Sequence, residues 1–331
     1  LDQADSANTV LRLTAMSFLA SSLMGVFVSA LRGLRRFSAA TLIATGSTTI
    51  SVIGAASAAA MGFGMVGAAA AQVFGVACGL VAAVGSCYTL LLAAEGGGAF
   101  WRQLRAMLGF SIWNYATRLI QMLVFQVDKI LIARWLGPAA LTFYSIPFNL
   151  AQRVNFLAGP AVTAIYPVAA VGRLDREQFM RQYLAASRLL HVATAALAIS
   201  VLAWGDRFLG AWVGPEMASQ GTFALRVLTV GFWVVSVGSF DGGCIEGWNR
   251  ARMTFAISAM GATVGLVTAV AVLWLWTMNS AAAAIALGVA AHLVTAGLAQ
   301  MAIWYRMSRY PASVMLWRAA LPIAEMGLLA A

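Results

Sequence analysis

Residues 252–277 read RMTFAISAMGATVGLVTAVAVLWLWT, with one charged residue, Arg252, at the start. About 20 apolar residues, rising 1.5 Å each, carry an α-helix across the hydrocarbon core of a bilayer. This stretch is therefore predicted to be a transmembrane helix. The same pattern predicts helices near residues 10–31, 38–62, 65–93, 106–136, 138–171, 187–205, 221–246, 252–277 and 281–305, and a last one beginning near 314.

The composition of the whole chain agrees with a membrane protein. Of 331 residues, 62% are hydrophobic and 10% charged, and the mean hydropathy is +0.85. A soluble domain is nearer half apolar and a quarter charged. Lipid-facing surface accounts for the excess, because the outer faces of membrane helices are apolar. The predicted fold class is all-α, a polytopic membrane protein.

The formal net charge of +10 comes almost entirely from arginine between the apolar runs. No basic stripe interleaved with aromatic residues marks a nucleic-acid surface, so no nucleic-acid partner is expected. When the connections are assigned alternately to two sides, thirteen arginines fall on one side and two on the other. The rich side is predicted to be cytoplasmic. Residue 1 then lies outside, so an odd number of preceding helices is expected.

One charged segment has two open interpretations. Residues 173–188 (RLDREQFMRQYLAASR) place Phe179, Tyr183 and Leu184 at helical spacing, as in an amphipathic helix on the inner surface. A solvated loop whose charges only set the orientation fits equally well.

An internal repeat joins two parts of the chain. Gly33 and Arg36 fall on Gly247 and Arg250 at an offset of 214 residues, and each pair is followed by two apolar helices. Repeats in the same orientation are common in transporters. Shifted back by 214, the helices that begin at residue 106 have partners before Leu1, so about three N-terminal helices are expected to be missing.

The candidate site residues are charges inside predicted spans. Arg118 lies near the middle of the helix 106–136 and Arg153 near the middle of 138–171. Such residues face the protein interior or a watery cavity. A polar stripe at helical spacing surrounds the first arginine: Asn114, Arg118, Gln121, Phe125 and Asp128.

These arginines have a functional and a structural interpretation. Arginine forks suit the oxygens of a phosphate or diphosphate. Alternatively, Asp128 and nearby carbonyls neutralise them within a structural network. Lys129 and Arg134 either mark the outer mouth of the same cavity or lie at the interface. No HExxH, GxSxG or P-loop motif and no ligand-spaced cluster of Cys, His or carboxylates occurs, so neither enzymatic activity nor a metal or cofactor is expected.

Two motifs resemble a known family. Residues 128–137 (DKILIARWLG), followed by Tyr144 and Pro167, resemble the start of the second lobe of polysaccharide-repeat-unit flippases, in the multidrug/oligosaccharidyl-lipid/polysaccharide exporter superfamily. Residues 31–37 (LRGLRRF) resemble the Gln-Gly-x-x-Arg signature of that family, with Arg32 in place of Gln.

The resemblance implies two six-helix lobes around a central cavity. Residues 1–95 would be the rest of the N-terminal lobe, 96–310 the C-terminal lobe and 311–331 the start of an extra helix. Members move undecaprenyl-diphosphate-linked oligosaccharides to the periplasmic leaflet of the bacterial inner membrane by alternating access. The resemblance gives Arg118 and Arg153 the role of holding the diphosphate, with Asn114, Gln121, Asp128 and Lys129 in the same cavity. Implied partners are the lipid-linked oligosaccharide, membrane lipids and the glycan polymerase machinery.

Two alternative functions are open for a membrane protein of this pattern. A drug/cation antiporter of the same superfamily favours an embedded acidic site, whereas the deep residues here are arginines. An integral-membrane glycan polymerase or glycosyltransferase tends to carry a long periplasmic loop, and the longest outer loop here, about residues 205–220, is too short for a catalytic domain.

Overall fold

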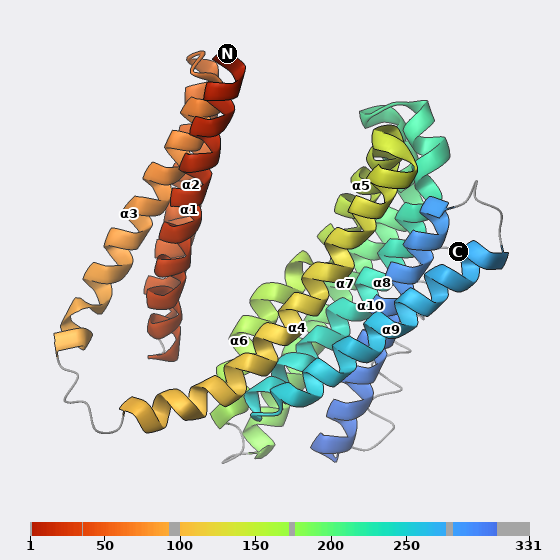
Figure 1. Cartoon of the computed structure of the whole chain (residues 1–331). Coiled ribbons are helices and arrows are strands. Elements are labelled where there is room, and N and C mark those ends of the chain that lie inside the picture. Colours follow the sequence, from red (N-terminus) through yellow and green to blue (C-terminus); the bar gives the residue numbers. More distant parts are fainter. Residues whose placement is uncertain (1, 35, 93–99, 172–175, 276–280, 310–331) are drawn as a thin grey trace. The chain divides into compact units, whose positions relative to one another are not determined.

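The computed structural model describes residues 2–34, 36–92, 100–171, 176–275 and 281–309, and every element in these ranges is helical (Figure 1). This confirms the predicted all-α class. The predicted helix from residue 314 lies outside the described residues. The elements are α1 (Asp2–Gly33), α2 (Phe37–Ala60), α3 (Gly64–Leu92), α4 (Phe100–Trp135), α5 (Gly137–Gln152), the 3₁₀ turn η1 (Arg153–Leu157), α6 (Ala158–Val171), α7 (Arg176–Trp212), α8 (Pro215–Gly247), α9 (Ala251–Leu275) and α10 (Ala281–Ser308).

Seven of the described helices are long and apolar enough to cross a membrane: α1, α2, α3, α7, α8, α9 and α10. Helix α4 is long but is not among them, since polar residues of the predicted stripe interrupt its apolar sequence. The chain is a multi-pass membrane protein by the length and composition of its helices.

The charged segment before the predicted span 187–205 is part of that span. Helix α7 runs unbroken from Arg176, so the solvated loop is wrong; the segment is helical with Phe179 and Tyr183 on one face, as predicted, but continues directly into the span. The reason is packing on one face of the segment. Phe179 and Tyr183 are buried against Trp304 of α10, with ring centroids 6.1 and 5.5 Å away.

The predicted helix 138–171 is broken in the middle. Helix α5 ends at Gln152, and the 3₁₀ turn η1 leads into α6. Pro160 accounts for the position of the break, because it has no N–H to bond the carbonyl of Phe156 and its ring crowds that carbonyl. Pro147 lies inside α5 without ending it. Of the prolines in the predicted helix, Pro147, Pro160 and Pro167, only Pro160 follows a region that loses α-helical bonding.

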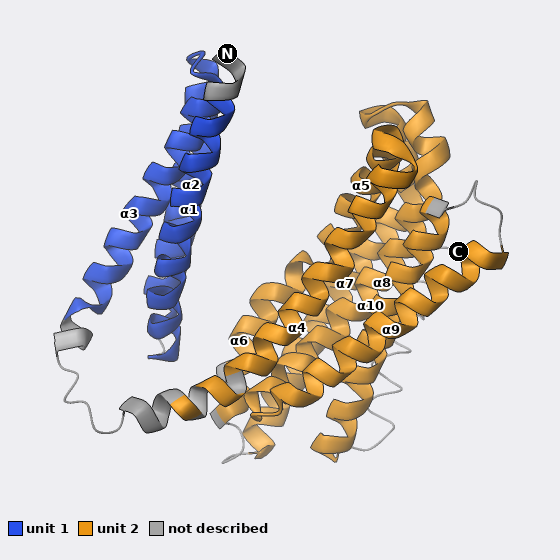
Figure 2. Ribbon diagram, in the orientation of Figure 1, with its two compact units in different colours: residues 1–100 blue, residues 101–331 orange. Residues whose placement is uncertain are grey.

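The chain divides into two compact units, Leu1–Phe100 and Trp101–Ala331, shown in Figure 2. In unit 1, α3 packs along both α1 and α2, which touch each other little. In unit 2, α8 is central and packs against α5, α6, α7 and α10, while α10 also packs along α9.

The predicted repeat is present in the structure. Helices α1, α2 and α3, shifted by 214 residues, fall within a few residues of α8, α9 and α10. The two turns that follow the first helix of each repeat also share their backbone hydrogen bonds. Leu34 N donates to Ala30 O and Arg36 N to Leu31 O. At the shifted positions, Trp248 N donates to Cys244 O and Arg250 N to Ile245 O.

Candidate functional site

A buried carboxylate fixes α4 to α5. Asp128 is 6% exposed, and its side chain accepts hydrogen bonds from the Tyr144 hydroxyl and from the Lys129 backbone N–H, both at 2.6 Å. Asp128 is thereby satisfied without any arginine. The Asp and the Tyr of the motif that carries the family resemblance are therefore bonded partners.

The outer half of the predicted polar stripe faces the core of unit 2. Phe125 packs on Phe148 of α5, Phe232 of α8 and His292 of α10, with ring centroids 5.9, 6.1 and 6.2 Å apart. Lys129 lies over the Phe148 ring at 4.4 Å, a cation–π contact that holds its ammonium on α5. This half of the stripe positions α4, and its side chains are engaged in packing.

The inner half of the stripe is more open. Arg118 is exposed, and Asn114 and Gln121 are partly exposed. The guanidinium of Arg118 lies close enough to Glu246, the penultimate residue of α8, for its charge to act on that carboxylate. Asp128, ten residues further along α4, is bonded to Tyr144 and not to Arg118.

Arg153 occupies the helix break. It is the first residue of η1 and is exposed, whereas Asn155 two residues later anchors the turn, its Oδ1 accepting a hydrogen bond from Ser236 Oγ of α8 at 2.9 Å. Within the described residues no acidic side chain forms an ion pair with Arg153.

The contacts between α4 and α5 set the two arginines at similar levels. The pairs Asp128–Tyr144 and Phe125–Phe148 show that the two helices run in opposite directions. Arg118 precedes Phe125 by seven residues and Arg153 follows Phe148 by five. At 1.5 Å per residue their Cα atoms lie about 10 and about 8 Å from the phenylalanine pair, towards the same end. The sequence predicted this common level.

One more arginine lies near this site. In the sequence it contributed only to the predicted orientation of the chain in the membrane. Arg252, in the first turn of α9, lies over the ring of Trp113 on α4 at 5.3 Å, and Trp113 packs on Phe255 at 5.1 Å. Trp113 precedes Arg118 by five residues, or about 8 Å along α4. No spacing in the sequence signals this contact, because it joins helices 140 residues apart.

The described residues contain no group of three or more His, Cys, Asp and Glu side chains that could hold a metal ion. Two other titratable groups are buried in unit 2. Asp241 of α8 accepts a hydrogen bond from Tyr183 of α7, and His292 of α10 is enclosed beside Gly261 of α9. Both lie within helix–helix contacts of unit 2.

Comparisons with known proteins agree with this architecture. The fold is similar to that of the lipid II flippase MurJ in its inward closed conformation, with a TM-score of 0.60 and 12% sequence identity over 96% of this chain and 67% of MurJ. The chain is 23% identical over 116 residues to the teichuronic acid biosynthesis protein TuaB of Bacillus subtilis (strain 168). That alignment covers 35% of this chain and 24% of TuaB, so the match spans about a quarter of the length of this relative.

Helices of this length, a MurJ-like fold and an internal repeat define a multi-pass membrane protein with the MurJ-like fold. Residues 3–216 match a family described as polysaccharide biosynthesis protein, which is more than half of the chain. The chain belongs to this family, and the resemblance found in the sequence is confirmed.

Proposed function

We propose that this chain takes part in moving undecaprenyl-diphosphate-linked oligosaccharides from the cytoplasmic to the periplasmic leaflet of the bacterial inner membrane. The observation that carries the proposal is the pair of exposed arginines, Arg118 on α4 and Arg153 at the end of the neighbouring α5, at similar positions along the two helices. The family match and the MurJ-like fold support it.

The chemistry of the two arginines suits a diphosphate. A guanidinium presents N–H donors in a planar fork that matches two phosphate oxygens, and it stays charged within a membrane protein. Two such groups balance the two negative charges of a diphosphate diester. The partly exposed amides Asn114 and Gln121 lie one turn to either side of Arg118 and supply neutral donors. Asp128 and Lys129 support the site by holding α4 on α5.

Glu246 has the role of an internal counter-ion. Its carboxylate lies within electrostatic range of the Arg118 guanidinium. An arriving diphosphate competes for the same guanidinium, so binding is coupled to release of α4 from the end of α8. The break at η1, next to Arg153, gives the neighbouring helix a point of bending for alternating access.

Transport of a fluorescent lipid-diphosphate oligosaccharide between leaflets of proteoliposomes tests the proposal, with the protein expressed from its full coding sequence. Arg118→Gln and Arg153→Gln are expected to slow transfer at least tenfold, because each removes one of the two cationic forks. Arg105→Gln is the matched control, since Arg105 is an exposed arginine near the start of the same helix.

The possible outcomes separate the functions. Transfer by the parent protein and by Arg105→Gln, with loss in both other variants, supports flipping at this site. Transfer that survives both substitutions makes the arginines structural and contradicts their role. Vesicles that export a cationic dye but transfer no lipid-linked glycan establish the antiporter instead.

A further inference from the structure

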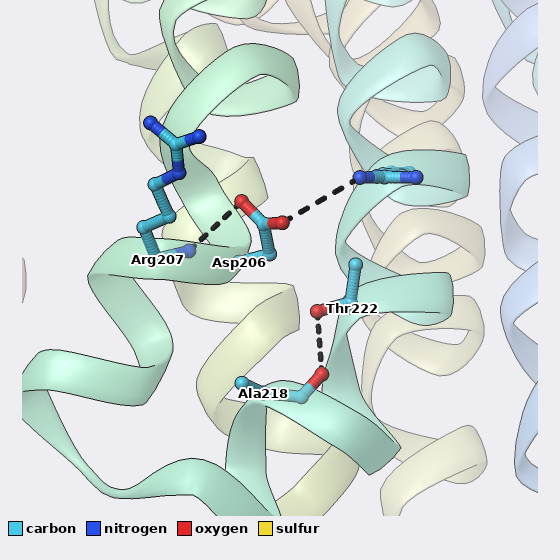
Figure 3. A network of polar contacts seen from close by, with 5 residues as sticks. Asp206, Arg207, Ala218 and Thr222 are labelled. Carbon is cyan, nitrogen blue, oxygen red and sulfur yellow. Dashed lines mark hydrogen bonds and ion pairs between the residues drawn. The ribbon is translucent and has the colours of Figure 1, made fainter.

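A second arginine-centred site lies at the arginine-poor end of unit 2. Arg226 of α8 has a side chain that is 56% exposed, and its Nη2 lies 3.8 Å from Asp206 Oδ2 of α7. The other carboxylate oxygen of Asp206 accepts the backbone N–H of Arg207 at 2.8 Å (Figure 3). Asp206 is thus held in place and faces α8.

The repeat gives Arg226 a counterpart. At the offset of 214 residues, Leu11-Arg12 falls on Leu225-Arg226. Arg12 is also exposed, and it lies at the same place in the first helix of its repeat, the eleventh residue of α1 as against the twelfth of α8. Two repeats that differ at most other positions have kept an arginine where a charge is costly in a membrane.

The level of Arg226 follows from helix lengths. Helix α8 has 33 residues, about 50 Å, so it extends roughly 10 Å beyond each side of a 30 Å hydrocarbon core. The Cα of Arg226 lies about 17 Å from the start of α8, some 7 Å inside the core. Side chains lean towards the N-terminus of their helix, so the guanidinium reaches the boundary where lipid phosphates lie. The same reasoning applies to Arg12.

The surroundings of Arg226 are apolar and open. Phe223 and Val230, one turn to either side on the same face of α8, are 50% and 42% exposed. On α1, Met16 and Leu19 are exposed on the face that carries Arg12. A charged group among exposed apolar side chains fits contact with lipid, where the headgroup supplies the counter-charge.

The charges define the class of ligand. Arg207 and Arg226 carry two positive charges, and Asp206 supplies one negative charge, which leaves an excess of one. A phospholipid phosphodiester carries one negative charge, and its two free oxygens match one guanidinium fork.

We propose that Arg226, oriented by Asp206, binds the phosphate of an anionic phospholipid in the leaflet at the arginine-poor end of the helices, and that Arg12 does the same in unit 1. Asp206 acts as a positioning residue and competes with the phosphate for the guanidinium. This site is independent of glycan translocation, because no residue of the Arg118–Arg153 site takes part.

Native mass spectrometry of the purified full-length protein tests the assignment, with phosphatidylglycerol and phosphatidylcholine as probes. Arg226→Gln is expected to reduce retained phosphatidylglycerol about fivefold, the effect of one basic residue at a membrane surface. Asp206→Asn is expected to increase retention, since it removes the competing carboxylate. Arg12→Gln should lower the number of bound lipids by one, and Arg181→Gln is the matched control, since Arg181 is an exposed, ion-paired arginine near the start of α7 and outside this site.

Opposite effects of Arg226→Gln and Asp206→Asn support the site, because a purely structural ion pair predicts the same loss in both. The site is refuted if Arg226→Gln retains as much phosphatidylglycerol as the parent, or if Arg181→Gln loses as much as Arg226→Gln. Equal retention of both probes by the parent also overturns the assignment to an anionic lipid. Because Asp206→Asn keeps every arginine, its effect on retained phosphatidylglycerol tests the site even if Arg226→Gln does not fold.

Discussion

Each of two buried aspartates in unit 2 has a tyrosine as its partner. Tyr144 bonds Asp128 between α5 and α4, and Tyr183 bonds Asp241 between α7 and α8. A buried carboxylate without donors costs several times what an ordinary hydrogen bond contributes. The hydroxyl therefore decides how these helices pair, and it gives a physical reason for the Asp and Tyr of the family motif.

The first prediction concerns the hydroxyl of Tyr144. Tyr144→Phe leaves the shape of the ring but removes a donor from buried Asp128, and we expect a loss of about 1–3 kcal/mol of unfolding free energy. The thermal midpoint of the protein in detergent, followed by size-exclusion fluorescence, measures it. Tyr115→Phe on the exposed face of α4 is the control. Equal midpoints for the two variants would show that the bond contributes nothing.

At the scale of elements, apolar run length determined most of the fold. The helix ends predicted from it agree within a few residues for α2, α3 and α9. Between α2 and α3 the chain turns at Gly62 and Gly64, both at positive φ. Two features of the fold could not be predicted from run length. The start of α7 looked like a surface segment, since burial of Phe179 and Tyr183 depends on Trp304, which is distant in sequence. The position of the break at η1 could not be predicted, because Pro147, Pro160 and Pro167 each favour a kink in the same predicted helix.

The second prediction tests the cause of that break. Pro160→Ala restores an N–H that can bond the carbonyl of Phe156, so η1 is expected to become α-helical. Hydrogen exchange of the amides of residues 153–157 should slow by roughly tenfold, as one α-helical bond per residue is gained. Pro147→Ala, inside unbroken α5, should leave these amides unchanged. Unchanged exchange in Pro160→Ala would mean that packing against α8, not proline, sets the break.

The candidate site was only partly predictable. The sequence located Arg118 and Arg153, because a charge inside an apolar run stands out. It offered one network of Asp128 and the arginines, whereas in the structure Asp128 is bonded to the Tyr144 hydroxyl and to the Lys129 backbone. Helix packing decides which charged side chains contact each other. The spacing of residues along a single helix does not contain that information.

At the scale of the whole molecule, the repeat provides a matched pair of glycines. A Cβ on Gly247 would lie 2.7 Å from Tyr166 O and 2.9 Å from the Cβ of Ala169, whereas at the equivalent Gly33 nothing lies within 4 Å. The same turn is thus packed under α6 in one repeat and open in the other. Its backbone hydrogen bonds are the same in both.

The third prediction follows from this difference. Gly247→Ala forces α8 and α6 apart and is expected to cost about 1–3 kcal/mol, the usual effect of overpacking. Gly33→Ala should change stability by less than about 0.5 kcal/mol. Thermal midpoints of the two variants measure the contrast. A similar change in both would mean that the glycines serve the shared turn and not the contact with α6.

The fourth prediction concerns the orientation of the whole chain in the membrane. The arginine-rich connections are expected in the cytoplasm, because they are retained on that side during insertion. In a variant without Cys78, Cys87 and Cys244, a cysteine at Ser219 near the start of α8 should react with an impermeant maleimide in intact spheroplasts. A cysteine at Arg181 near the start of α7 should react only after lysis; both positions are exposed. The reverse pattern would invert the direction of the proposed transport, because Arg118 and its counter-ion Glu246 would then receive their ligand from the periplasmic side.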